Sequence, residues 1–129
     1  MIFADTSAII AYFCPDDERH LSAKNLLGNV QETIIISDHV LDETITFIAR
    51  RYDSNFAYAV GKKIFSSKET LLQTATMEDL NKALETVKKH RKMSFCDALS
   101  VIIMQNNKIK KILSYDSDFD YVKGIQRIH

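Results

Sequence analysis

Four acidic residues of this 129-residue chain stand where an apolar stretch meets the start of a helix: Asp5, Glu43, Asp97 and Asp116. In a protein whose strands and helices alternate, such positions fall along one edge of a sheet. Carboxylates gathered on one edge repel each other unless a cation lies between them, and Mg²⁺ or Mn²⁺ is the simplest such cation. A divalent ion held by carboxylates indicates chemistry on phosphoryl groups.

Each of these acids also has a plainer explanation as a helix cap. Asp5 and Asp116 could cap the helices that follow them, and Ser94 with Asp97 fits a capping box in which Asp replaces Glu or Gln. Glu43 would complement a helix dipole. The stretch after Asp97 is apolar, however, and a carboxylate at the start of a buried helix is costly unless it is paired or bound to metal. Taken together, the four acids therefore favour one shared site.

The composition predicts an ordinary globular protein, with 46% hydrophobic and 26% charged residues. A chain of this length suits one domain that spans residues 1–129. The 17 Lys and Arg residues balance the 17 Asp and Glu residues, so the net charge is zero. This balance excludes a globally basic nucleic-acid binder and leaves room for a local basic patch.

The cysteines and the N-terminus indicate a reducing compartment. Cys14 and Cys96 show no spacing typical of metal sites or of a disulfide framework, so we expect both to be small buried hydrophobic residues. The apolar N-terminal stretch has no basic segment before it and is interrupted at Asp5, so we expect neither a signal peptide nor a membrane span. These features predict a cytoplasmic protein with no membrane association.

Apolar and β-branched runs alternate with stretches of helical periodicity along the whole chain. This alternation predicts right-handed crossovers and a mostly parallel sheet with helices on both faces, which is an α/β fold. The expected strands are residues 1–4, 33–36, 70–74, 111–114 and 124–128. The expected helices are residues 8–13, 20–27, 38–52, 55–65, 77–90 and 95–104.

Such a fold brings the four acids together. Asp5 and Asp116 directly follow strands, and Glu43 lies in the first turns after the second strand. The helix of Asp97 runs antiparallel to the strand that follows it, so its start lies at the carboxyl end of that strand. Ligands of open α/β sheets bind beyond the carboxyl ends of the strands, where all four side chains are expected to converge.

Short motifs in five places resemble those of the PIN-domain ribonucleases and, within that family, the VapC-like toxins. The resemblance begins with the apolar strand into Asp5-Thr6-Ser7 and ends at Val122–Ile125, so it covers nearly the whole chain. Each motif alone is weak, but their order within one small domain is fairly specific. The central motifs are Asp38–Glu43, Ser94–Ala98 and Ile112–Phe119.

The resemblance implies a three-layer α/β/α sandwich with a mostly parallel central sheet. It implies a Mg²⁺- or Mn²⁺-dependent endoribonuclease that hydrolyses RNA, the toxin of a toxin–antitoxin pair, with a cognate antitoxin protein and a homodimer as partners. Asp5 and Asp97 would be the central metal ligands, and Glu43 and Asp116 would complete the catalytic acidic pocket. Supporting hydroxyl or backbone groups would come from Thr6 or Ser7 and from Ser114.

Two of these positions have a competing neighbour. Asp118 stands in the same motif as Asp116, which is preferred because it is nearer the strand end, so that Asp118 is expected in a turn or a supporting position. Asp42 competes with Glu43, but it points about 100° away on an ideal helix, and the longer Glu43 matches the family position.

Two groups of residues are candidates for binding partners. A basic run just before the Asp97 helix could contact RNA phosphates, or it could be a solvated helix end. The apolar N-terminal helices could form a groove for the antitoxin, or they could be ordinary core. The basic run is Lys88, Lys89, Arg91 and Lys92. The apolar residues are Ile9, Ile10, Tyr12, Phe13, Leu21, Leu26 and Leu27.

Two other functions remain open on the residues alone. A non-catalytic RNA-binding or assembly module could keep the same fold, although the presence of all four acids argues against it. A phosphatase or a phospho-accepting receiver also uses an acidic pocket in an α/β fold. The haloacid dehalogenase pattern needs a second Asp two residues after Asp5, where Ser7 stands instead, and the receiver pattern is not clear in this chain.

Overall fold

A computed structural model describes residues 1–90 and 92–129 of the chain. Its centre is a five-stranded sheet of order β3-β2-β1-β4-β5, in which every neighbouring pair is parallel. This confirms the parallel α/β sheet predicted from the sequence. The strands are β1 (Ile2–Ala4), β2 (Ile34–Ser37), β3 (Thr70–Gln73), β4 (Lys111–Leu113) and β5 (Gln126–Ile128).

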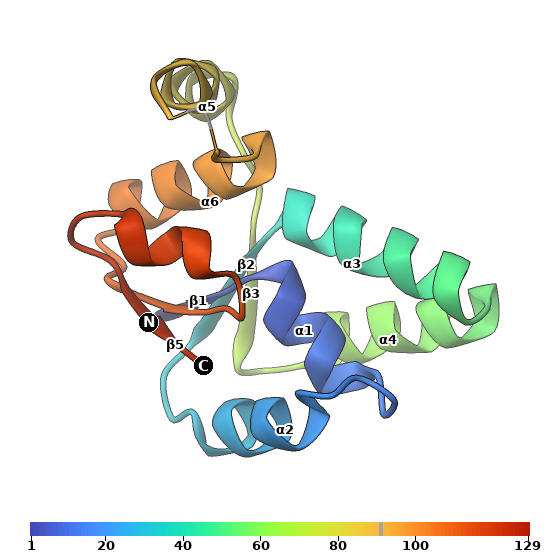
Figure 1. The fold of residues 1–129 in the computed structure, drawn as a ribbon. Coiled ribbons are helices and arrows are strands. Elements are labelled where there is room, and N and C mark those ends of the chain that lie inside the picture. Colours follow the sequence, from blue (N-terminus) through green and yellow to red (C-terminus); the bar gives the residue numbers. More distant parts are fainter. Residues whose placement is uncertain (91) are drawn as a thin grey trace.

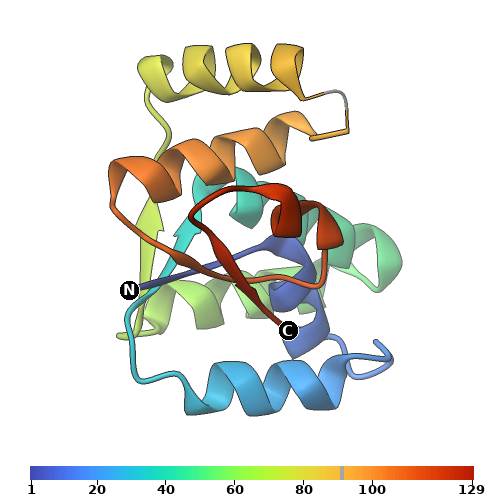
Figure 2. The same cartoon turned by 60° about the vertical axis from the view of Figure 1, so that its left-hand side comes forward.

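Helices cover both sides of this sheet. Figures 1 and 2 show α5 and α6 on one side and α2, with α1 beside it, on the other, which confirms the three-layer arrangement. A short 3₁₀ helix, η1, lies between β4 and β5 and was not predicted, because five residues are too few to show a periodic pattern. The helices are α1 (Thr6–Phe13), α2 (His20–Asn29), α3 (Asp38–Arg51), α4 (Ser54–Ser66), α5 (Met77–Lys89), α6 (Phe95–Asn106) and η1 (Ser117–Tyr121).

Polar side chains fix where several helices begin. The Ser37 hydroxyl accepts a hydrogen bond from the Val40 backbone N–H at 3.1 Å, so α3 starts directly at the carboxyl end of β2. Thr76 and Asp79 form a reciprocal capping box at the start of α5. Such caps satisfy backbone donors that the first turn of a helix leaves without partners. The caps therefore fix the start of α3 directly after β2 and the start of α5 a short loop after β3.

The order of the strands places a topological switch point between β1 and β4. The chain moves from β1 to β2 and β3 on one side, and α5 and α6 then carry it back to β4 on the other side of β1. Ala4 pairs with Leu113, and the Asp5 backbone N–H donates to the Leu113 carbonyl at 2.9 Å, which extends the ladder by one residue. The register therefore sets Asp5 beside the end of β4, where α/β sheets bind ligands.

The helix α6 is the most buried helix of the described residues. Every residue from Ala98 to Met104 is buried, because the helix lies between the sheet and α5 (Figures 1 and 2). This explains why the sequence is apolar nearly all round over this stretch. A helix held on two sides gives its first turn, and with it Asp97, a fixed position.

No helix within the described residues combines the length and the apolar character needed to cross a membrane.

We predict that Leu99→Ala lowers the free energy of unfolding by about 2–5 kcal/mol, because it leaves a cavity between α6 and the sheet. Leu99 is 0% exposed, whereas Leu84 on the outer helix α5 is 58% exposed. Leu84→Ala is the matched control and should change stability by less than about 0.5 kcal/mol. Urea unfolding measures both changes in the free energy of unfolding. Equal losses of stability in the two variants would contradict the burial of α6 between the sheet and α5.

Candidate active site

The carboxylate of Asp5 lies buried at the switch point. Its Oδ2 atom accepts hydrogen bonds from the Ser7 hydroxyl at 2.8 Å, the Ser114 hydroxyl at 2.9 Å and the Ser7 backbone N–H at 3.3 Å. Asp5 is thus the N-cap of α1, as the capping explanation predicted. All three bonds end on the same oxygen, so they fix the direction of the carboxylate without using Oδ1.

Ser7 and Ser114 also tie the two turns beyond β1 and β4 together. The Ser7 hydroxyl oxygen accepts from the Tyr115 backbone N–H at 2.9 Å, and the Ser114 hydroxyl oxygen accepts from the Asp116 backbone N–H at 3.0 Å. Because each hydroxyl donates its hydrogen to Asp5, the oxygens of Ser7 and Ser114, which are 3.3 Å apart, touch without a hydrogen bond between them. The two serines therefore hold both turns around one carboxylate.

Asp97 lies half-buried in the first turn of α6. The Ser94 hydroxyl accepts from the Asp97 backbone N–H at 3.0 Å and donates to Asp97 Oδ2 at 2.6 Å. This is the N-cap that the sequence predicted, with the carboxylate bound to the hydroxyl of the cap. Capping and membership of an acidic cluster are therefore compatible at this position, since one carboxylate serves both.

Glu43 reaches the same region from α3. Its Oε2 accepts from the Thr6 hydroxyl at 2.7 Å, and Thr6 directly follows Asp5. Asp42 instead accepts from Thr46 of its own helix at 3.5 Å and lines a separate groove between α3 and α4. The structure thus brings Glu43, and not Asp42, to the start of α1.

Asp116 and Asp118 are separated by the start of η1. Asp116 Oδ1 accepts from the Asp118 backbone N–H at 2.8 Å, so Asp116 is the cap and Asp118 is the residue being capped. The negative charge of Asp116 is one of the causes that raise the pKa of Asp97, so these two carboxylates lie close enough to interact. The structure therefore brings Asp116 near Asp97 and makes it the N-cap of η1.

The electrostatics of the cluster are those of crowded carboxylates. Burial raises the pKa of Asp5 above its usual value, although the bonds from Ser7 and Ser114 oppose part of this rise. Burial also raises the pKa of Asp97, and the negative charges of Asp5 and Asp116 raise it further. Negative charge is therefore costly at this site, and a cation between the carboxylates would relieve that cost.

Cys96 is a member of this site that the sequence did not indicate. Burial, followed by the negative charges of Glu43, Asp97 and Asp5, raises the pKa of its thiol. The prediction of a buried cysteine holds for Cys14, whereas Cys96 is only half-buried. Residues on a helix that is apolar all round give no periodic signal of which side faces a pocket, so only the packing of α6 shows it.

The donor set fits a hard divalent ion such as Mg²⁺ or Mn²⁺, which prefers carboxylate oxygens. Within residues 1–90 and 92–129, no Lys, Arg or His nitrogen lies within 4.0 Å of the four carboxylates. No trio of His, Cys, Asp or Glu side chains in that part forms a ready metal cage. Mg²⁺ usually keeps several waters and binds one or two carboxylates directly, so this cluster does not need such a trio.

The basic run lies on the side of Asp97. Lys88 and Lys89 end α5, and Lys92 lies in the loop that leads into α6; all three are exposed. Arg91 lies outside the described residues. All three lysines therefore come shortly before the first turn of α6, which carries Asp97.

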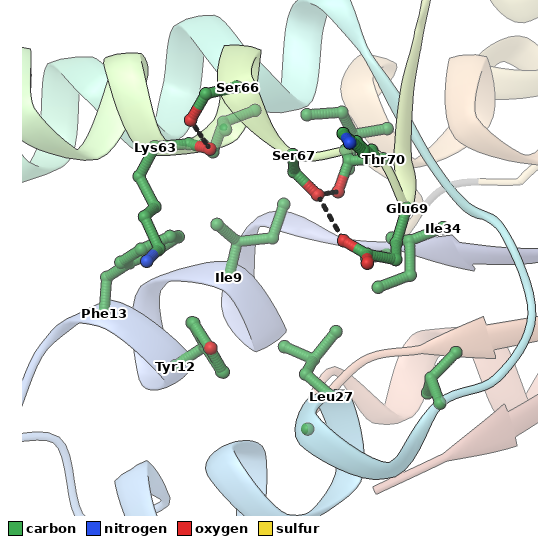
Figure 3. Close-up of a pocket in the computed structure, with 16 residues that line it drawn as sticks. Ile9, Tyr12, Phe13, Leu27, Ile34, Lys63, Ser66, Ser67, Glu69 and Thr70 are labelled. Carbon is green, nitrogen blue, oxygen red and sulfur yellow. Dashed lines mark hydrogen bonds between the residues drawn. The ribbon is translucent and has the colours of Figure 1, made fainter.

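A cavity of about 580 Å³ lies between α1, α2, α4 and the loop before β3. Figure 3 shows Ile9, Tyr12 and Leu27 around the space, with Lys63 and Glu69 at other parts of its lining. Of the apolar residues considered for a groove, Ile10 and Leu26 pack against the core, and Leu21 is exposed. Those that line the cavity are Ile9, Tyr12, Phe13 and Leu27.

The fold and the acidic cluster define an α/β protein with a polar site at its switch point, and comparison with known proteins identifies the family. The PIN domain model matches residues 2–125. The 23S rRNA-specific endonuclease VapC20 of Mycobacterium tuberculosis is 34% identical over 121 residues, which are 92% of each chain. Its crystal structure, described as that of a sarcin–ricin loop cleaving toxin, matches with a TM-score of 0.87 and 32% identity over 93% of each chain.

More distant proteins agree with this match. Ribonuclease VapC26 of Mycobacterium tuberculosis is 23% identical over 114 residues, covering 87% of this chain and 84% of the relative. A toxin–antitoxin complex from Klebsiella pneumoniae shares the fold, with a TM-score of 0.73 at 13% identity over 98% of this chain and 96% of that chain.

The chain belongs to the PIN-domain family and is a nuclease of the VapC type. The family, the α/β/α fold and the hydrolase class predicted from the motifs are confirmed. The alternative of a non-catalytic module is not supported by this match. PIN-domain nucleases of the VapC type are generally metal-dependent.

We predict that Asp5→Asn raises the stability of the metal-free protein at neutral pH. A carboxyl whose folded pKa is raised holds its proton more tightly in the folded state, so stability falls as pH rises from the ordinary value of 3.8 through the raised pKa. The stability that Asp5→Asn gains over the wild type should therefore be largest at neutral pH. It should shrink as the pH falls from the raised pKa of Asp5 toward 3.8. Thermal unfolding in EDTA between pH 4 and 8 measures it.

The control for this experiment is Asp42→Asn, which removes a carboxylate that is exposed. Its stability difference from wild type should not follow the same pH trend. A loss of stability in Asp5→Asn that persists across the whole pH range would contradict the account of Asp5 as a destabilised charge.

Proposed function

We propose that this protein is a Mg²⁺- or Mn²⁺-dependent endoribonuclease that hydrolyses RNA phosphodiester bonds and acts as the toxin of a toxin–antitoxin pair. One observation carries the proposal. Asp5, Asp97 and Asp116 come from three distant parts of the chain, the charges of Asp5 and Asp116 raise the pKa of Asp97, and no Lys, Arg or His nitrogen among the described residues lies within 4.0 Å of these carboxylates. Such a cluster is suited to a divalent cation and a phosphate.

In this proposal Asp5 and Asp97 are the central metal ligands, and Glu43 and Asp116 complete the pocket. When bound, the ion activates a water molecule and offsets the charge of the phosphate. The chain's own contribution is to orient the carboxylates through hydrogen bonds from hydroxyl groups. Ser7 orients Asp5, and other hydroxyls of the site do the same for Asp5 and the other acids. Those other hydroxyls are Ser114 on Asp5, Thr6 on Glu43 and Ser94 on Asp97.

The substrate we propose is the sarcin–ricin loop of 23S rRNA. The support is VapC20, the rRNA-specific relative, which resembles this chain over 92% of both sequences and matches its backbone with a TM-score of 0.87. The exposed lysines at the end of α5, together with Lys92, would contact RNA phosphates on the α6 side of the pocket, where such contacts position the strand without reading its sequence.

The partner we propose is a protein antitoxin that places apolar side chains in the cavity between α1, α2 and α4. The cavity wall is largely apolar and includes Ile9, Tyr12 and Leu27, while Lys63 and Glu69 offer charges to a bound segment. We also propose a homodimer, on the basis of the family resemblance. Size-exclusion chromatography with light scattering tests the dimer.

We predict that Asp97→Asn lowers RNA cleavage to below about 1% of the wild-type rate. Removing a direct metal ligand should reduce activity more than the loss of about 10- to 100-fold that is typical when a group around the ligands is changed. The assay follows cleavage of a sarcin–ricin loop hairpin in Mn²⁺ and in EDTA. Cleavage by the wild type should be lost in EDTA and restored by added Mg²⁺ or Mn²⁺.

The matched control is Asp42→Asn, which changes the same functional group on an exposed part of α3 and should cleave at the wild-type rate. A second hairpin of unrelated sequence tests the substrate. Equal cleavage of both hairpins contradicts the proposed target, and wild-type cleavage by Asp97→Asn contradicts the proposed site.

A further inference from the structure

Tyr115 is the residue between Ser114 and Asp116, and it is fixed at both ends. Its backbone N–H donates to the Ser7 hydroxyl at 2.9 Å, and its phenol O–H donates to the Ser22 hydroxyl of α2 at 2.9 Å. The ring therefore spans the distance from the acidic cluster to the first turn of α2. An aromatic ring held at both ends is a rigid surface beside the site.

A cation lies on this ring. The guanidinium carbon of Arg19 is 5.3 Å from the centre of the Tyr115 ring, within the range of a cation–π interaction. Its nearest acid is Glu18, at 3.3 Å, and the two side chains are 46% and 80% exposed. An ion pair as exposed as this contributes little, so Glu18 does not prevent the guanidinium from binding another anion.

We propose that Arg19, held over Tyr115, binds a backbone phosphate of the substrate next to the one that is cleaved. The inference rests on the proposed ribonuclease function. Arg presents a planar set of donors that matches phosphate oxygens, and stacking on a fixed ring reduces the freedom that it loses on binding.

The charge distribution of the chain supports this role. A polyanion that approaches an acidic pocket needs positive charge near its rim, and this chain has no net positive charge to supply it globally. The lysines at the end of α5 lie on one side of the sheet, whereas α2 covers the other side (Figures 1 and 2). Arg19 therefore supplies positive charge on the side of the pocket that those lysines do not cover.

Other cations over tyrosine rings do not share this position. Arg51 lies 5.4 Å from the Tyr52 ring but is bound to Asp16 at 3.0 Å. Lys24 lies 4.7 Å from the ring of Tyr12, which lines the cavity of Figure 3. Of the three pairs in the described residues, only the Arg19 pair is linked to the acidic cluster, through the hydrogen bonds from Tyr115 to Ser7 and from Ser7 to Asp5.

We predict that Arg19→Ala lowers kcat/KM for the hairpin about tenfold, mainly through KM, which is the size expected for one charge-assisted hydrogen-bonded contact. The slope of log kcat/KM against log salt concentration should become shallower by about 0.7–1, as expected when one phosphate contact is lost. Arg19→Lys keeps the charge and should recover part of the loss.

The matched control is Lys24→Ala, which removes an exposed cation of α2, the helix whose N-cap is Arg19, and should leave KM and the salt slope unchanged. Affinity is also measured by fluorescence anisotropy of the labelled hairpin, with each change made in the Asp97→Asn protein. Equal affinities and equal salt slopes for the Arg19→Ala and Lys24→Ala proteins would overturn the inference.

The two proposals fail in different ways. If the wild type does not cleave RNA, the proposed function fails, and anisotropy still decides whether Arg19 binds the phosphate backbone. If the wild type cleaves the hairpin and Arg19→Ala does so with the same KM and the same salt slope, only the role of Arg19 is lost.

Discussion

The buried carboxylate of Asp5 imposes the constraint from which the other features of the site follow. A charge beyond the ends of β1 and β4 has to be compensated, because it has lost most of its contact with water. Ser7 and Ser114 supply three hydrogen bonds to one of its oxygens, and in doing so they pin the turns that carry Tyr115 and Asp116. These bonds orient the charge but do not neutralise it, since burial still raises the pKa of Asp5. The remaining cost of the buried charge favours the binding of a cation, which the neighbouring acids would share.

The rest of the fold serves to hold those neighbours at fixed positions. The strands near the switch point are only three or four residues long, so their register and the helix caps decide where each acid lies. Packing on two sides fixes α6 and therefore Asp97, while the bond from Thr6 links Glu43 to the turn after β1. A shift of one residue in the pairing of Ala4 with Leu113 would move Ser114 away from Asp5. The core therefore stabilises the protein and also sets the geometry of the site.

Charge is separated locally in a chain that is neutral overall. The acids gather at one point of the sheet edge, the exposed lysines lie where α5 ends, and Arg19 lies over Tyr115 on the other side. Each arrangement has a separate physical cause: strand order for the acids, the C-terminal dipole of a helix for the lysines, and a fixed aromatic ring for Arg19. A polyanion would meet positive charge on both sides before it reached the acidic centre. Selectivity for RNA would then depend on the spacing of these groups, because the net charge is zero.

The sequence by itself determined the parallel α/β order and the edge on which the acids converge. Apolar runs and helix caps are local signals, so they can be recognised without knowing how the helices pack. It also carried the motifs of the PIN-domain family. Tertiary structure alone decided which carboxylates lie close enough to interact, so that the charge of Asp116 acts on Asp97. It also brought Cys96 among the acids and Tyr115 beneath Arg19. These contacts depend on the rotation of α6 and on the path of two loops. Long-range packing sets both, and no periodic pattern in the sequence predicts them.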